Sequence, residues 1–254
     1  RSHRFRAVDG RVVRVHTRRN HVRGVDRHLH PGLTPDALEP DLRSRFRTVE
    51  SPVTIATDEV IQVIHPSNSD DLISEQDFAK DDRLPYWADL WPAAVVLARF
   101  IRGLRGEGRT LLELGCGSGV VATAAARAGF DVTATDYYED SPLFARSNAW
   151  RNAQVDITAR CADWNSFPSD LRNFDLVVAS DVLYEQRNAP LIARTMAQSL
   201  SQHGEGWLAD PGRVGSAGFP DWCISHALTC ETVAQVPIEA GAHLHTINLL
   251  RITR

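Results

Sequence analysis

The amino-acid sequence predicts an α/β fold in which a doubly wound, mostly parallel sheet is covered by helices. Three observations support this prediction. From Thr110 onward, short apolar segments alternate with segments of helical character. One of these segments, FDLVVAS at 174–180, is apolar and β-branched, as expected of a strand that is buried on both faces. A turn with three glycines at alternate positions, within LLELGCGSG at 111–119, follows the first strand of the series.

The segments before this alternating region predict a β-rich lead-in. Alternating patterns around tight turns indicate hairpins, and a proline in the first turn is typical of a helix start. The expected elements are a hairpin over 5–15 turning at Asp9-Gly10, a helix over 35–46, a hairpin over 48–66 turning at Thr57-Asp58, a loop or short helix over 67–83, and a helix over 92–101.

The alternating region predicts five strands and four helices, followed by an antiparallel pair. The strands are expected at 110–114, 131–135, 155–160, 174–180 and 206–210, and the helices at 119–128, 142–152, 187–200 and 216–227. Ser141-Pro142 is typical of a helix cap followed by a first-turn proline. The last segments, 231–238 and 243–254, are joined by a connection too short for a helix, so they should pair antiparallel.

Charge is distributed unevenly along the chain. Residues 1–30 carry nine Arg and two Asp, a formal charge of +7, so the rest carries −11 of the total of −4. A basic arm of this kind favours an acidic partner or nucleic acid. The alternative is a solvated extension. Lys80 is the only lysine, so the chain as a whole prefers arginine, which weakens any inference from arginine counts.

The cysteine pattern favours a reducing compartment. Four cysteines are spread along the chain without a CxxC pair, which indicates reduced thiols in a cytoplasmic protein rather than a disulfide framework. No group of residues has the spacing of metal ligands. No apolar run is long enough to span a membrane and no signal peptide is found, so we expect no membrane partner. Because the first residue is not methionine, we expect that a few residues were trimmed or are foreign to the protein.

The glycine turn predicts a ligand that needs close approach to bare backbone. Gly115, Gly117 and Gly119 permit positive φ angles, and the following helix directs free N–H groups at the site. A dinucleotide and S-adenosylmethionine both use such a turn, and Gly117-x-Gly119-x-x-Ala122 is a weak dinucleotide match. Glu113 favours S-adenosylmethionine, because a carboxylate there repels a pyrophosphate but suits ammonium and sulfonium charges. A purely structural turn is the remaining alternative.

Polar and aromatic residues follow the next two strands. Asp136 is placed to accept both ribose hydroxyl hydrogens, which both ligand classes offer, or else it caps a helix. Tyr137 either packs on adenine or is an ordinary loop aromatic. Asp163 is placed to accept from the adenine amino group. Trp164 either lies beside the adenine ring or anchors the core.

The motifs together resemble a known family. LELGCGSG, TATD, CADW and VVASDVLYE, in this order, resemble the seven-β-strand (class I) S-adenosylmethionine-dependent methyltransferases. Within that class the chain is most similar to the protein-lysine methyltransferase group (methyltransferase family 16) that carries a D-x-x-Y motif after strand four, here Asp181-Val182-Leu183-Tyr184. PYWADLWPAAVVLARFI and WLADPGR (207–213) also resemble segments of this group. The resemblance covers roughly residues 45–254.

The resemblance implies a Rossmann-like sheet of seven strands that ends in an antiparallel hairpin. We expect the hairpin at 5–15 to be an N-terminal β-hairpin extension of this fold. The domain division that we predict is a basic extension over 1–47 and a methyltransferase domain over 48–254, whose lead-in is 48–109. The resemblance also implies that S-adenosylmethionine is the cofactor.

The resemblance further implies a site for the methyl acceptor. Asp181 would orient an incoming ammonium and assist its deprotonation, and Tyr184 would wall the amine channel. Trp91 would cover the methionine part of the cofactor, and Ser180 would lie beside it. The alternatives are a cap for Asp181, a core aromatic for Tyr184 and packing alone for Trp91.

The predicted function is methylation of a protein lysine amine. A small-molecule N- or O-methyltransferase is the main alternative, and a non-catalytic nucleotide-binding or scaffold protein is the alternative from another class. The strand-four motif lacks the proline of base-methylating enzymes, which argues against a nucleic-acid substrate. The acceptor itself, the number of methyl groups transferred and the oligomeric state do not follow from the sequence.

Overall fold

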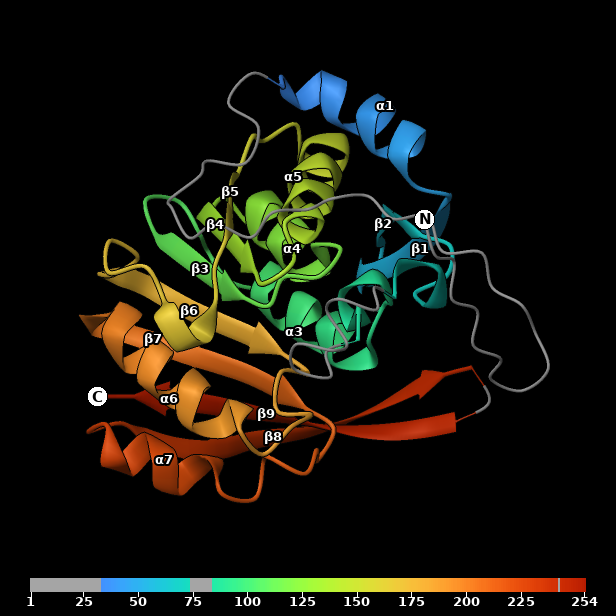
Figure 1. Cartoon of the computed structure of the whole chain (residues 1–254). Helices are drawn as coiled ribbons and strands as arrows, with labels where there is room; N and C mark the ends of the chain where they lie inside the picture. Colours follow the sequence, from blue (N-terminus) through green and yellow to red (C-terminus); the bar gives the residue numbers. More distant parts are fainter. Residues whose placement is uncertain (1–32, 74–83, 242) are drawn as a thin grey trace, which may run out of the picture.

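The computed structural model of the chain describes residues 33–73, 84–241 and 243–254. Figure 1 shows a central sheet with helices on both faces, which confirms the predicted α/β class. The hairpin that the sequence predicts at 5–15 lies outside the described residues.

Most of the predicted elements are present. The strands are β1 (Thr48–Ala56), β2 (Glu59–Pro66), β3 (Thr110–Leu114), β4 (Asp131–Asp136), β5 (Thr158–Cys161), β6 (Phe174–Ser180), β7 (Leu200–Asp210), β8 (Thr229–Ala240) and β9 (His243–Thr253). The helices are α1 (Pro35–Arg45), α3 (Pro92–Arg102), α4 (Val120–Arg127), α5 (Asp140–Ala153), α6 (Asn188–Ser199) and α7 (Phe219–Ser225), with 3-10 turns η1 (Asp70–Leu72), η2 (Tyr86–Ala88) and η3 (Trp164–Ser166).

The main sheet has seven strands in the order β5-β4-β3-β6-β7-β9-β8. The first five are parallel, and β9 runs antiparallel between β7 and β8. The strand order therefore reverses at β3, since β4 lies on one side of it and β6 on the other. In an open α/β sheet, ligands bind at the carboxyl ends of the strands on either side of such a reversal.

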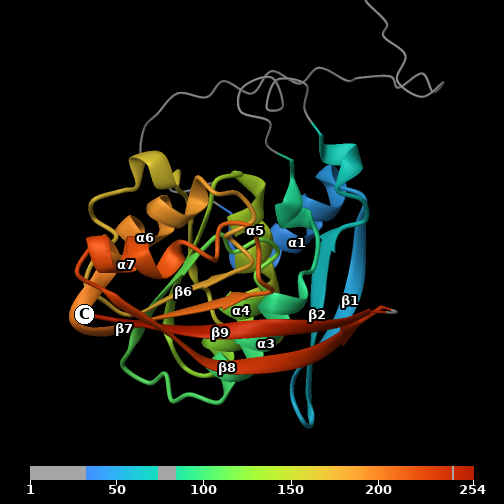
Figure 2. The ribbon, with the colours of Figure 1, turned by 90° about the horizontal axis from the view of Figure 1, so that it is seen from below.

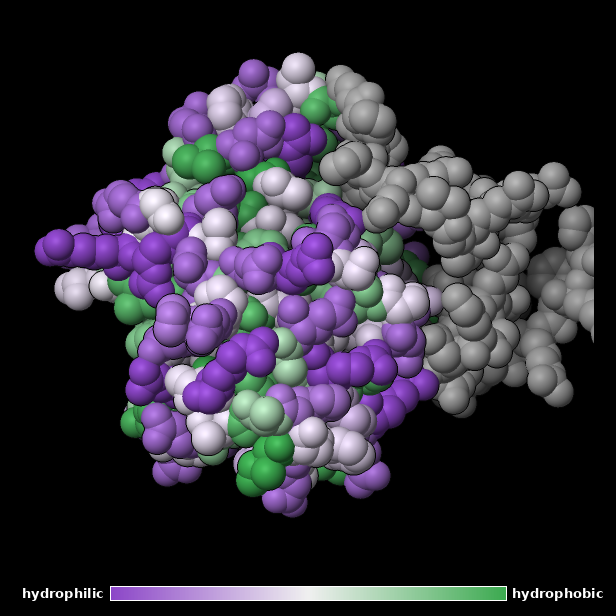
Figure 3. Space-filling model, turned by 90° about the vertical axis from the view of Figure 1, so that its left-hand side faces the viewer, coloured by the Kyte–Doolittle hydropathy of each residue, from purple (hydrophilic) through white to green (hydrophobic). Residues whose placement is uncertain are grey.

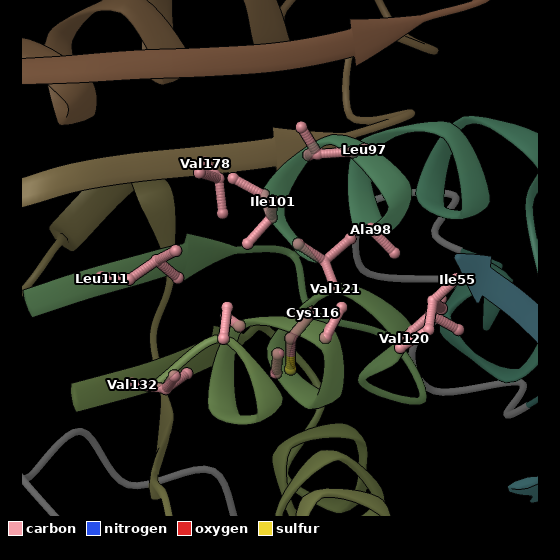
Figure 4. Close-up of a cluster of buried hydrophobic side chains, with 14 of the residues drawn as sticks. Ile55, Leu97, Ala98, Ile101, Leu111, Cys116, Val120, Val121, Val132 and Val178 are labelled. Atoms are coloured by element: carbon pink, nitrogen blue, oxygen red, sulfur yellow. The ribbon is translucent and has the colours of Figure 1, made fainter. Parts of the chain in front are cut away.

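Each face of the sheet is covered by its own helices. Alternate residues of the central strands contribute to two separate apolar clusters, one under α3 and α4 and the other under α6 and α7. In the first cluster, Leu111 and Val178 of the sheet face Ile101 of α3 and Val121 of α4 (Figure 4). The helices thereby fix the strand ends at which the site is built.

The lead-in forms a second layer beside the parallel core. β1 and β2 make the predicted hairpin, which turns at Thr57-Asp58 (Figure 2). The buried side chain of Asn148 on α5 joins this hairpin to the glycine turn, because its amide bonds Ile64 N and O at 2.8 Å and the Ser118 carbonyl at 2.9 Å. Helix α1, from the predicted extension, packs on α5 through Leu38 and Leu42.

Four sequence predictions need correction. The third parallel strand covers 158–161 instead of 155–160, β7 begins at Leu200 instead of 206, and α7 is shorter than the predicted helix at 216–227. Ser141 does not cap α5, which begins one residue earlier; its hydroxyl instead donates to the Gly117 carbonyl at 2.8 Å.

Polar side chains dominate the face shown in Figure 3, with apolar residues scattered among them. Within the described ranges, none of the helices combines the length and apolarity needed to cross a bilayer.

Candidate functional site

The glycine turn after β3 has the backbone conformation that the sequence predicts. Gly115, Gly117 and Gly119 all have positive φ, at 71°, 51° and 81°. The N–H groups of Gly115 and Cys116 both donate to the Thr135 carbonyl at 2.9 Å, which fastens the turn to β4. The turn is thus held open at the carboxyl end of the sheet.

Three other segments converge on this turn. A Cβ on Gly115 would lie 3.0 Å from Val182 Cγ1 and 3.2 Å from Trp164 Cζ2, and a Cβ on Gly117 would lie 3.2 Å from the Trp87 carbonyl oxygen. Bare backbone at these two positions therefore lets the three segments pack closely against the turn.

Asp136 closes the turn from the end of β4. Its Oδ2 accepts from Gly117 N at 3.0 Å and its Oδ1 from Tyr138 N at 3.2 Å. Burial raises the pKa of this carboxyl, and the backbone hydrogen bonds from Gly117 and Tyr138 oppose the rise. Each carboxylate oxygen keeps a second lone pair, so these bonds leave Asp136 able to accept from ribose hydroxyls.

Glu113 presents an unpaired carboxylate oxygen beside the turn. The side chain is 1% exposed, and its Oε2 has no hydrogen-bond partner among the described residues. Burial raises its pKa well above the usual range; a hydrogen bond with the Ala122 backbone opposes this, and the charge of Asp136 adds to it. A buried carboxyl group with an unpaired oxygen next to the glycine turn fits a ligand that brings positive charge and favours the ionised form, as S-adenosylmethionine does.

We expect Glu113→Gln to stabilise the ligand-free protein but weaken cofactor binding. Because the folded-state pKa of Glu113 is raised, its contribution to stability is present at low pH and is lost as the pH rises through that value. The neutral amide should therefore raise the free energy of unfolding by about 1 kcal/mol at pH 8, and the gain should vanish toward pH 4. Affinity for S-adenosylhomocysteine, whose ammonium loses a carboxylate partner, should fall about tenfold.

Urea unfolding at the two pH values and calorimetric titration check this prediction. Glu107→Gln, at an exposed position, is the matched control. A variant that is less stable than the wild type at pH 8 would show that Glu113 acts mainly as a structural hydrogen-bond acceptor.

The structure shows the protein contacts of Asp163, Trp164 and Tyr137, the three residues that the sequence predicts beside adenine. Asp163 caps η3, since its Oδ1 accepts from Asn165 N at 2.9 Å and Asn165 Nδ2 at 3.0 Å. The Trp164 ring borders Gly115 and packs partly against the cluster under α6. Its Nε1 is buried without a partner in the described part of the chain. Tyr137 lies edge-to-face with Tyr138 at 5.4 Å between ring centroids.

Asp181 follows Ser180, the last residue of β6, and is held by an arginine. It is 8% exposed and has a left-handed backbone, with φ at 56°. Arg213 binds its carboxylate in a fork, with Nε–Oδ1 at 2.7 Å and Nη2–Oδ2 at 3.1 Å. Ser180 itself pairs with Ala209 in the β6–β7 ladder. No local motif of the sequence predicts a role for Arg213, although this residue closes the WLADPGR segment.

Three aromatic rings, Tyr86, Trp91 and Tyr184, form what we term the acceptor wall. The Tyr184 and Tyr86 centroids are 5.4 Å apart and those of Tyr86 and Trp91 6.0 Å, both edge-to-face. The guanidinium carbon of Arg213 lies 5.3 Å from the Trp91 centroid. Trp91 therefore lies beside Arg213, while the main chain of Trp87 lies over the glycine turn.

The sheet order, the reversed last strand and the glycine turn define the fold of class I S-adenosylmethionine-dependent methyltransferases. A sequence profile described as "Lysine methyltransferase" matches residues 71–209. The chain belongs to this family, which confirms the resemblance found in the sequence.

Individual relatives agree with this placement. The electron transfer flavoprotein beta subunit lysine methyltransferase of Danio rerio is 30% identical over 148 residues, 57% of this chain and 55% of that protein. EEF1A lysine methyltransferase 3 of Mus musculus is 31% identical over 140 residues, 52% and 59% of the two chains. The chain thus spans about half the length of the curated relatives it matches.

Solved structures support the fold. The 16S rRNA N2 G1207 methyltransferase RsmC of T. thermophilus, in complex with AdoMet and guanosine, superimposes with a TM-score of 0.55 at 14% identity. The match covers 82% of this chain and 50% of that one.

Proposed function

We propose that the protein transfers the methyl group of S-adenosylmethionine to the side-chain amine of a lysine in another protein. The observation that carries the proposal is the close approach of the D-x-x-Y segment to the glycine turn. Val182, inside the D-x-x-Y motif, lies 3.0 Å from where a Gly115 Cβ would be. The segment that carries Asp181 and Tyr184 therefore adjoins the turn that would hold the methyl donor.

When bound, S-adenosylmethionine supplies a methyl group that its positively charged sulfur already activates. The chain then has to hold a nucleophile in line and in its unprotonated form. Asp181 supplies a hydrogen-bond acceptor for the amine, and the faces of Tyr86 and Tyr184 suit an alkylamine that arrives as a cation. Glu113, Asp136 and the glycine turn are the residues that would hold the cofactor.

Incubation with tritiated S-adenosylmethionine and a host lysate tests this proposal. We expect labelled protein bands that yield methylated lysine on hydrolysis, and no such bands with the Asp181→Asn variant. Label confined to the small-molecule fraction would contradict the proposal and favour a small-molecule methyltransferase.

Two narrower proposals concern the partner and the location. We propose that the Arg-rich residues 1–30 dock an acidic partner. Their charge of +7 supports this, and removal of the segment should then weaken labelling in a salt-dependent way.

We also propose a cytoplasmic location. The four free cysteines support this proposal, and cell fractionation checks it.

A further inference from the structure

We propose that Arg213 is a positioning residue of the acceptor site, which makes Asp181 an oriented hydrogen-bond acceptor for a neutral amine. The inference rests on the proposed function for the nature of the acceptor. It assigns a role to a residue that the D-x-x-Y motif does not contain.

The carboxylate of Asp181 is fixed in direction. Its backbone N–H donates to the Ala209 carbonyl at 2.9 Å, and the side chain is only 5% exposed. The guanidinium of Arg213 then donates one N–H group to each carboxylate oxygen, an arrangement that a lysine cannot reproduce.

Arg213 is itself held from two sides. Oδ2 of the fully buried Asp210 accepts the N–H groups of Gly212 at 2.7 Å and Arg213 at 3.0 Å, which folds the turn after β7 back toward β6. The Trp91 ring lies against the guanidinium. The Arg213 side chain nevertheless stays 37% exposed, so it stands at the mouth of the site.

This pairing changes what Asp181 offers an amine. The fork occupies one lone pair on each carboxylate oxygen and leaves the others free to accept from an amine N–H. Asp181 therefore orients the amine along the direction of these free lone pairs.

The charge of Arg213 acts on the amine as well. A like charge close by disfavours an ammonium, so the guanidinium favours the unprotonated nitrogen, whose lone pair is the nucleophile. Among the described residues, the other titratable groups that face Arg213 are the buried carboxyl of Asp210, from β7, and the hydroxyl of Tyr86, from η2. Tyr184, which follows β6, lies against Tyr86. Once Arg213 is neutralised, the nearby carboxylates would favour the ammonium form.

The test compares Arg213→Gln and Arg213→Lys with the wild type. The rate is the total tritium passed from S-adenosylmethionine to lysate acceptors between pH 6 and pH 10. For Arg213→Gln we expect the acid limb of the rate profile to move up by about one pH unit, a tenfold loss at a fixed pH on that limb. Arg213→Lys keeps the charge and loses the fork, so its limb should stay in place while the plateau rate falls about threefold or more.

Arg187→Gln, a neutralised arginine in the loop that follows Tyr184, is the matched control and should leave the profile unchanged. Calorimetric titration with S-adenosylhomocysteine and thermal unfolding show whether each variant is folded. A parallel loss of rate at every pH in Arg213→Gln, or no loss at all, would overturn the inference.

Failure of the proposed function gives a different result. If label enters only small molecules, protein methylation is wrong, and the rate profile of total label still tests Arg213. If the wild type transfers no label, the role of Arg213 is tested by the binding of n-butylamine in the presence of S-adenosylhomocysteine. The wild type should bind this amine more tightly at pH 10 than at pH 8, and Arg213→Gln should lose that preference. Equal pH dependence in both proteins would overturn the inference.

Discussion

Asp181→Asn is expected to lower kcat about a hundredfold, within the range that the loss of correct positioning of a nucleophile costs. The amide keeps the size of the side chain and its tolerance of the left-handed backbone at φ 56°, but it loses the charge that Arg213 and the amine both recognise. Cofactor binding depends on Glu113, Asp136 and the glycine turn, so the dissociation constant of S-adenosylhomocysteine should change less than about twofold. Initial-rate kinetics and calorimetric titration separate the two effects.

Asp170→Asn is the matched control, because Asp170 also pairs with an arginine, Arg160, but on the exposed surface. It should have wild-type kcat. An Asp181→Asn enzyme with wild-type kcat would remove Asp181 from the mechanism, and a parallel loss of cofactor affinity would mean that the substitution disturbs the whole site.

Gly119→Ala should destabilise the fold by about 3 kcal/mol, because two costs add. The φ of 81° is strained for any residue with a Cβ, and that Cβ would lie 2.4 Å from Cα of Ala145 on α5. Backbone atoms of a packed helix cannot move aside cheaply, so α4 and α5 would have to separate. Urea unfolding measures the loss.

Gly108→Ala isolates the first of these costs. Gly108 has a similar φ of 76°, but nothing among the described residues lies within 4 Å of its Cβ position. We expect a loss of about 1 kcal/mol there. Equal losses at the two positions would show that the close approach of α4 and α5 costs nothing.

The order of the elements could be predicted from the sequence because local signals agree with tertiary structure there. The β1–β2 hairpin has alternating apolar residues around a two-residue turn, and the centre of β6, residues 176–179, is continuously apolar because both of its faces are buried. β7 was harder to predict. Its first half, from Leu200 to Glu205, is polar and resembles a loop, yet it extends the strand past a register shift against β6.

Tertiary contacts also decide where β5 begins. The apolar residues Val155 and Ile157 suggest strand, but pairing with β4 starts only at Thr158. Asp156 instead binds Arg146 of α5, with one N–O distance of 2.5 Å. Single-sequence patterns carry no signal for such a partner.

The candidate site shows the same division. The glycines and strand-end carboxylates could be found because each belongs to a local motif. Arg213 meets Asp181 across 32 residues of sequence, and Tyr86 meets Tyr184 across a still longer stretch, so neither pairing could be predicted. The only local sign of a role for Arg213 in the sequence is its place after a glycine in the turn that follows β7.

The place of β9 in the sheet has a consequence for biosynthesis. Because β9 lies between β7 and β8, both of which leave the ribosome earlier, those two strands have no partner on their facing edges until residues 243–253 emerge. Until then the nascent chain presents two unpaired edges to the crowded cell, so we infer that chaperone protection matters most before β9 has emerged.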